Sequence, residues 1–139
     1  MNTEQYLSQL RSLKRQIACK RRDAEMWRNI AENISVDLES ERVQTSGTQD
    51  KMADAIVKAT DCEREASNLT YDMIMLQQQI MAQIDGLNDL DYSMVLSEFY
   101  VHGMSLLQIA NEWGRSVRHI KRVKADAMEK FTRIFGEIF

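Results

Sequence analysis

Apolar residues recur over the first forty positions of the chain at alternating intervals of four and three. The stripe consists of Tyr6, Leu10, Leu13, Ile17, Lys20, Ala24, Trp27, Ala31, Ile34 and Leu38, and only one of its members is polar. These are the a and d positions of a heptad, which fall on one side of a helix and pack against a neighbouring helix. The pattern predicts a helix over about residues 3–40.

A second stripe with the same spacing predicts a helix over about residues 51–85. Its members are Met52, Ala55, Ala59, Cys62, Ala66, Leu69, Met73, Leu76, Ile80 and Gln83. The polar segment between the stripes, residues 40–50, predicts a loop in which Thr48 or Asp50 caps the second helix. Gly86 is expected to close that helix.

Each of these helices has only a narrow apolar seam, so the two seams are expected to meet. The sequence therefore predicts a long antiparallel coiled-coil hairpin over residues 1–86. Its register does not bring Cys19 opposite Cys62, and both are predicted to be free thiols. A second hairpin, in a homodimer, is expected to cover the apolar residues outside the seam, which are Leu7, Ile30, Ile56 and Ile74.

Residues 87–139 follow a shorter pattern that predicts three helices, at about 90–101, 106–113 and 117–135. Glycines and capping residues separate them: Asn88 or Asp89 as the first cap, Gly103, the capping box of Ser105 with Gln108, Gly114, and Ser116 as the last cap. The absence of proline from the whole chain also favours helix. The predicted fold is all-α, with the hairpin followed by this C-terminal domain.

The two last predicted helices have the features of a helix-turn-helix. Ala110 is small enough for the helices to approach closely, and Gly114, four residues later, lets the chain turn with a positive φ. The apolar residues expected in the tri-helical core are Ile109, Trp113, Ile120 and Val123, with Met94, Val95, Phe99 and Tyr100 from the preceding helix. Basic residues on the outward face of the last helix would then meet DNA; they are Arg118, His119, Lys121 and Arg122, with Lys124 behind them.

Charge is distributed unevenly, so the net charge of −3 is a poor guide to partners. Residues 1–28 sum to +4, residues 29–112 to −11 and residues 113–135 to +5. An anionic partner is therefore compatible with this chain. The basic residues at 13–22 have two readings: a second contact to the DNA backbone, or a solvated helix face that pairs with acidic residues such as Asp72.

Two runs of residues resemble region four of bacterial sigma factors. They are Tyr100-x-x-Gly103-x-Ser105-x-x-x-Ile109-Ala110-x-x-Trp113-Gly114-x-Ser116 and Ile120-Lys121-Arg122-Val123-x-x-x-Ala127-Met128-x-x-Phe131. The whole arrangement is similar to small phage transcriptional regulators of the ArpU/RinA type, although the hairpin matches them only in character.

This resemblance implies a phage or prophage transcription regulator that binds duplex DNA through the helix beginning at Val117. Carried over position by position, Arg118, Lys121 and Arg122 would read bases, flanked by Val117 and His119. Arg115 replaces a residue that is often apolar in the family and suits a phosphate contact. Arg118 stands where primary sigma factors often have an acidic residue, so the DNA sequence read should differ from a standard −35 element.

The predicted DNA-binding set is therefore Arg115, Ser116, Val117, Arg118, His119, Lys121, Arg122 and Lys124. Arginine can bond bidentately to guanine, whereas contacts to phosphates add affinity without sequence information. The backbone amides at the start of the last helix can also hold a phosphate.

Two other functions are open for this chain, and the first of them also combines a helix-turn-helix with an oligomerising helical part. One is a small terminase-like subunit of a DNA-packaging machine, and the other is an interaction protein that binds RNA polymerase. No glycine-rich phosphate loop, HExxH motif or Cys/His pairing is present, so no enzyme activity, cofactor or metal is expected. No apolar run approaches the roughly 20 residues of a membrane span, and no signal peptide is evident, which predicts a cytoplasmic protein.

Overall fold

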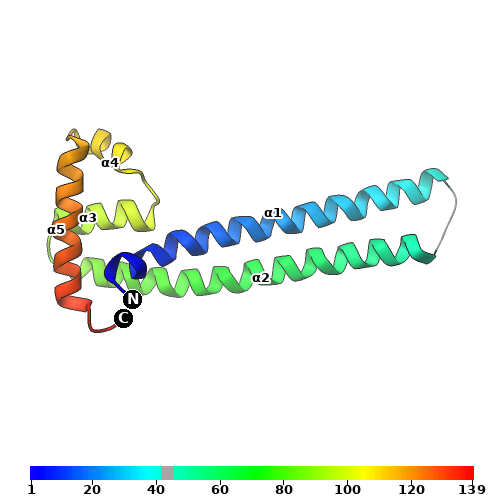
Figure 1. Ribbon diagram of the computed structural model, residues 1–139, viewed down its shortest axis with the longest axis horizontal. Helices are drawn as coiled ribbons and strands as arrows, with labels where there is room; N and C mark the ends of the chain where they lie inside the picture. Colours follow the sequence, from blue (N-terminus) through cyan, green and yellow to red (C-terminus); the bar gives the residue numbers. More distant parts are fainter. Residues whose placement is uncertain (42–45) are drawn as a thin grey trace. The chain divides into compact units, whose positions relative to one another are not determined.

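The computed structural model describes the backbone of residues 1–41 and 46–139, and the side chains of residues 1–34 and 49–139. Within them the regular structure is helical throughout, as the sequence predicts: α1 (Thr3–Glu41), α2 (Ser46–Asp85), α3 (Leu90–Leu96), η1 (Ser97–Val101), α4 (Leu106–Trp113) and α5 (Val117–Phe135) (Figure 1). The chain divides into two compact units. Unit 1 is Met1–Leu13 with Met73–Phe139, and unit 2 is Lys14–Asp72.

Unit 1 is built around one core of large side chains. Tyr100, Phe131, Leu7, Leu10, Ile80, Ile84, Leu87, Leu96, Ile109, Ile120 and Val95 are all fully buried there. Helix α5 packs on both α3 and α4, and Figure 1 shows it in orange to red, crossing α3. Burying several such side chains at roughly 1.5–3 kcal/mol each is the main source of stability for a unit of this size.

The first thirteen residues belong to the same unit as this core. The heptad pattern instead placed residues 1–86 together in the hairpin. Leu7 is 0% exposed and packs with residues of α3 to α5, so it needs no second copy of the chain to cover it. Tyr6 stacks on Phe139 with ring centroids 4.3 Å apart, and its hydroxyl donates to Gln83 Oε1 at 2.7 Å. Periodicity identifies which residues of a helix are buried, but not which distant segment covers them.

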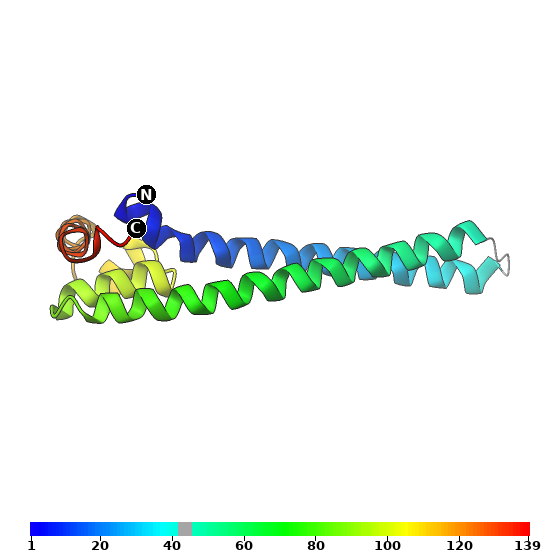
Figure 2. The same ribbon diagram turned by 90° about the horizontal axis from the view of Figure 1, so that it is seen from below.

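Unit 2 consists of parts of α1 and α2 that run side by side in both views (Figures 1 and 2). Apart from Ile17, the buried apolar residues among its described side chains are alanines: Ala24, Ala31, Ala55, Ala59 and Ala66. The described members of both predicted stripes are all buried or half-buried. Alanines in the seam leave room for the two backbones to approach closely, but each contributes little apolar area.

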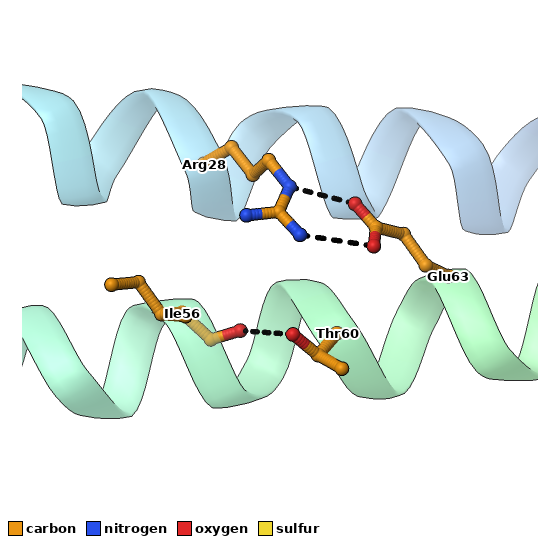
Figure 3. A network of polar contacts seen from close by, with 4 residues as sticks. All are labelled: Arg28, Ile56, Thr60 and Glu63. Atoms are coloured by element: carbon orange, nitrogen blue, oxygen red, sulfur yellow. Dashed lines mark hydrogen bonds and ion pairs between the residues drawn. The ribbon is translucent and has the colours of Figure 1, made fainter.

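Ion pairs and a cation–π contact connect the two helices of unit 2. Arg28 donates from Nε and Nη2 to the two carboxylate oxygens of Glu63, at 2.7 and 2.9 Å (Figure 3). Lys20 Nζ lies 2.7 Å from Glu65 Oε2, and Lys58 Nζ lies 4.6 Å from the ring centroid of Trp27. The two ion pairs fit an antiparallel arrangement, because the partner of Lys20 is Glu65 and the partner of Arg28, further along α1, is Glu63.

Two predictions about helix ends require correction: the loop at residues 40–50 and the cap at Gly86. The loop at residues 40–50 is too long, because α1 continues to Glu41 and α2 begins at Ser46. Thr48 and Asp50 are therefore inside a helix and are not N-caps. The loss of an apolar stripe predicts the end of a buried face, which is not the same as the end of a helix. Helix α2 ends at Asp85 as predicted, but Gly86 does not have the positive φ of a C-terminal glycine cap.

The predicted helix at 90–101 is interrupted by a π-helical segment. Helix α3 gives way to η1 after Leu96. In a π-helix residues five apart lie on the same side, which explains why Val95 with Tyr100, and Leu96 with Val101, are all buried. Met94, expected in the core from α-helical spacing, is instead 38% exposed.

Candidate nucleic-acid interface

Helix α4 begins with the capping box that the sequence predicts. Ser105 Oγ accepts from the backbone N–H of Gln108 at 3.1 Å, and Gln108 Oε1 accepts from the backbone N–H of Ser105 at 2.8 Å. Each side chain satisfies an amide that would otherwise lack a partner at the start of the helix. The start of α4 is therefore fixed by local bonds.

Gly114 ends α4 with the left-handed backbone that the sequence predicts, at φ 66° and ψ 35°. The next amide, of Arg115, donates back to the carbonyl of Ala110 at 3.0 Å. Ala110 itself is buried, and so is Ile109 beside it. The small side chain and the turn together set the direction in which the chain enters α5.

Helix α5 begins directly after this turn, where Ser116 Oγ accepts from the backbone N–H of His119 at 3.1 Å. Ile120, Val123, Ala127 and Phe131 are buried and form its inner face. The helix dipole adds partial positive charge at its first turn, where free amides can meet an anion. This end of α5 is therefore electropositive even before its side chains are counted.

Four of the predicted site residues place full positive charges around the same helix start. Arg115, Arg118, Lys121 and Arg122 are exposed, and within the part of the chain that the structure describes none of them forms an ion pair. Two other cations of α5 have an acidic partner: Lys124 lies beside Glu4 and Arg133 beside Glu129. The uncompensated cations leave this surface suited to a polyanion.

Arg118 and Arg122 also share a surface hollow with Ser116 and His119, with a volume of about 520 Å³. Arg122 Nη2 lies 3.2 Å from His119 Nδ1. Because a guanidinium can only donate, this contact makes Nδ1 the acceptor and leaves the proton of a neutral imidazole on Nε2. The hollow joins side chains from successive turns of α5 into one cationic surface. Val117, which lies between Ser116 and Arg118 in the sequence, is half-buried against the core.

Lys124, the last of the predicted set, lies elsewhere. Its Nζ is 3.7 Å from Glu4 Oε2 and 4.4 Å from the ring centroid of Phe99, and its side chain is 20% exposed. Tyr100 also donates to Glu4 through its hydroxyl. Lys124 thus helps to join residues 1–13 to α5 and is not grouped with the exposed cations.

The pKa values around Glu4 reflect these contacts. Burial favours a protonated Glu4, but the hydrogen bond from Tyr100 and the charge of Lys124 outweigh it and lower the pKa of this carboxyl. Burial, together with the carboxylate of Glu4, raises the pKa of Tyr100 well above its ordinary range. The cluster therefore holds one negative and one positive charge against a neutral phenol.

The other basic stretch, at residues 13–22, is partly compensated. Lys20 pairs with Glu65, which supports the interpretation of a solvated helix face, although the partner is not Asp72. Arg15, Arg21 and Arg22 are exposed and form no ion pair with the described residues. Cys19 and Cys62 are free thiols, as the sequence predicts.

Sequence reasoning missed the contact that fixes Trp113. Its indole Nε1 donates to Glu98 Oε2 at 2.9 Å, so a residue expected only as core also anchors α4 to η1. A half-buried tryptophan usually finds a partner for its N–H, and the acidic character of residues 85–112 was a signal for what that partner would be.

Searches of protein-family models, of curated proteins and of solved structures found no match to this chain. Among the described residues, no three His, Cys, Asp or Glu side chains are grouped so that they could hold a metal ion. None of the described helices has both the length and the apolar character needed to cross a membrane.

Proposed function

We propose that this chain is a DNA-binding transcription regulator of phage or prophage origin, which reads duplex DNA with the start of α5. The observation that carries the proposal is the group of four uncompensated cations, Arg115, Arg118, Lys121 and Arg122, around one capped helix terminus. DNA binding of this kind draws its affinity from phosphate neutralisation and its specificity from base edges.

The packing of α3, α4 and α5 on one core supports the interpretation of this part as a tri-helical helix-turn-helix. In that arrangement α4 crosses the DNA backbone and α5 enters the major groove. Arg118, Lys121 and Arg122 would reach base edges, and Arg115 and Ser116 would hold the flanking phosphate. The resemblance of residues 100–131 to sigma region four supports the same assignment.

The coiled-coil hairpin of α1 and α2 is the proposed dimerisation element. Ile56 and Val57 are 38% and 57% exposed on its surface, which leaves apolar area for a second hairpin. A homodimer would present two reading helices and gain affinity by holding two half-sites at once. Light scattering should then give twice the 16.2 kDa of one chain. A ring of many subunits would favour a packaging role, and a monomer would contradict the dimer.

The decisive experiment selects binding sites for the full chain from random duplex DNA and measures the affinity of the best site. In Arg118→Ala/Arg122→Ala the specific affinity should fall, by about 1–3 kcal/mol for each lost base contact. If only phosphate contacts are lost, the slope of log affinity against log salt should flatten by about 2.

Arg15→Ala/Arg21→Ala is the matched control, because it removes two exposed arginines from the other basic stretch. It should leave the selected sequence unchanged. If the α5 variant binds every DNA as tightly as the parent, α5 is not the reading helix. If the parent chain binds no DNA even at low salt but still binds RNA polymerase, the role as a polymerase-binding protein is favoured instead.

A further inference from the structure

Unit 1 carries an acidic groove beside α3 and η1, which adjoins the proposed DNA contact at Arg115 and His119. Two hollows, of about 520 and about 370 Å³, adjoin there and share Met94, Glu98 and Glu112 as lining residues. Because both are lined entirely by residues of unit 1, the groove belongs to that unit alone.

The floor of the groove is apolar and exposed. Leu90 is 75% exposed and Met94 is 38% exposed, one turn apart on α3, and Met104 and Trp113 are the other large apolar residues of the lining. Both exposed residues lie on the side of α3 that faces away from the buried Val95 and Leu96. An exposed apolar floor surrounded by polar residues is typical of an interaction site.

The rim of the groove carries four carboxylates, those of Asp85, Asp91, Glu98 and Glu112. Glu98 accepts the hydrogen bond from Trp113, whereas the other three form no ion pair within the described part of the chain. Arg115 is the one arginine or lysine among the lining residues. The groove is therefore strongly electronegative only a short distance from the cationic start of α5.

This combination restricts what can bind. The carboxylates repel a nucleic acid, and they are not grouped as metal ligands. An uncharged apolar segment would bury three carboxylates without partners, which is costly. A segment with lysines or arginines around one or two large apolar side chains satisfies both the rim and the floor.

We propose that this groove docks a basic amphipathic helix of a partner protein. Its apolar side chains lie against Leu90 and Met94, and its cations pair with Asp91, Glu112 and Asp85. The groove and the hollow of Arg118 and Arg122 adjoin at His119, but the carboxylates that pair with the partner are not among the proposed DNA contacts. Partner and DNA therefore occupy neighbouring surfaces and bind at the same time. The proposal does not depend on the proposed function, because it rests on different residues.

The test uses the full chain with Trp27→Phe, which leaves Trp113 in the groove as the single tryptophan. The probe is a fluorescein-labelled helical peptide of about 15 residues with leucines four apart and lysine or arginine at the flanking positions. A second peptide replaces every lysine and arginine with glutamate. Binding is followed by peptide anisotropy and by Trp113 emission.

The basic peptide should bind saturably and shift Trp113 emission, and added salt should weaken it. Leu90→Ser/Met94→Ser, and separately Asp91→Asn/Glu112→Gln, should each weaken binding by about tenfold or more. Two controls should bind like the parent: Leu107→Ser, which changes a 60% exposed residue of α4 outside the groove, and Asp50→Asn/Asp72→Asn, which removes the same charge from unit 2. Circular dichroism checks that each variant remains folded.

Three results would overturn the proposal: no saturable binding of the basic peptide, equal binding of the acidic peptide, or equal binding by groove and control variants. Displacement of the peptide by duplex DNA would contradict the proposal that partner and DNA bind at the same time. Loss of DNA binding in Arg118→Ala/Arg122→Ala with intact peptide binding would leave this inference standing, so the two proposals fail separately.

Discussion

The two compact units of this chain are held together by different means. Unit 1 buries leucine, isoleucine, tyrosine and phenylalanine side chains in one core, whereas the buried residues described in unit 2 are mostly alanines, and ion pairs connect its two helices. Apolar burial is insensitive to salt and scales with area, but exposed ion pairs are weak and screened. The comparison indicates that unit 1 supplies most of the stability and that unit 2 responds more to its ionic surroundings.

The two tryptophans allow each unit to be followed separately. Trp113 lies in unit 1 beside Glu98, and Trp27 lies in unit 2 beneath Lys58. Chains with only one tryptophan, made by Trp27→Phe or Trp113→Phe, are the parents for the variants below. Each unfolding curve then reports one unit.

The largest effect is expected from Phe131→Ala. Phe131 is 0% exposed and lies against the rings of Tyr6, Phe135 and Phe139. Its truncation leaves a cavity in the core and should lower the free energy of unfolding of unit 1 by about 3–5 kcal/mol. Urea titration followed by Trp113 emission measures it.

Ile134→Ala is the control on the same helix, because Ile134 is 47% exposed, and it should cost well below about 1 kcal/mol. If Phe131→Ala shifts the Trp27 curve as much as the Trp113 curve, the units unfold together and the comparison between them fails.

A smaller loss is expected when the alanine seam is overfilled by Ala59→Leu. Ala59 is 0% exposed, so a larger side chain forces the two helices apart, at a cost of about 1–3 kcal/mol. Thermal unfolding followed by Trp27 emission should show it. Val57→Leu enlarges a residue that is 57% exposed on the same helix and should be nearly neutral. Equal curves for the two variants would show that the seam is not closely packed.

Glu4→Gln tests the polar link within unit 1 and should cost about 1 kcal/mol near neutral pH, after allowance for solvent screening. The lowered pKa of Glu4 means that the folded chain resists protonation of this group more than the unfolded chain does. Its stabilisation is therefore present above its ordinary pKa of 4.5 and disappears as the pH falls through the lower folded value.

Unfolding free energies of parent and Glu4→Gln should accordingly converge as the pH is lowered below 4.5. Glu25→Gln, which neutralises an exposed carboxylate elsewhere on α1, should run parallel to its parent. A constant difference between parent and Glu4→Gln over the whole pH range would show that the charge of Glu4 contributes nothing.

The smallest effect is expected from Arg28→Lys in unit 2. The charge remains, but the two parallel hydrogen bonds to Glu63 are lost, and both groups are exposed to water. The midpoint of the Trp27 curve should fall slightly at low salt and match the parent at about 1 M salt, where the Debye length is near 3 Å. A difference that persists at high salt would point to packing instead of charge.

The sequence predicted local features well because local bonds determine them. Ser105 and Ser116 cap their helices and Gly114 ends α4, each through contacts within a few residues. Both heptad stripes were confirmed as the buried sides of α1 and α2 wherever side chains are described. Such signals depend only on neighbouring residues, so a single sequence contains them.

Features that depend on distant partners were not predictable in the same way. Lys124 was grouped with the exposed cations, and nothing in its neighbourhood indicated that Glu4 would lie beside it. Met94 was expected in the core but is 38% exposed, because it lies on the side of α3 that faces away from the buried Val95 and Leu96. The acidic groove joins residues of α3, η1 and α4, and it became visible only once those helices were placed.

Unit 1 combines residues 1–13 with residues 73–139, which are far apart in the sequence, and this affects how the protein folds on a ribosome. Leu7 and Leu10 are synthesised first, but their core partner Phe131 follows roughly 6–25 seconds later at ordinary rates of translation. Through that interval the nascent chain presents unsatisfied leucines to chaperones and proteases, while residues 14–72 can already pair. Slow translation between Leu10 and Phe131 would lengthen this exposure and lower the yield of native protein.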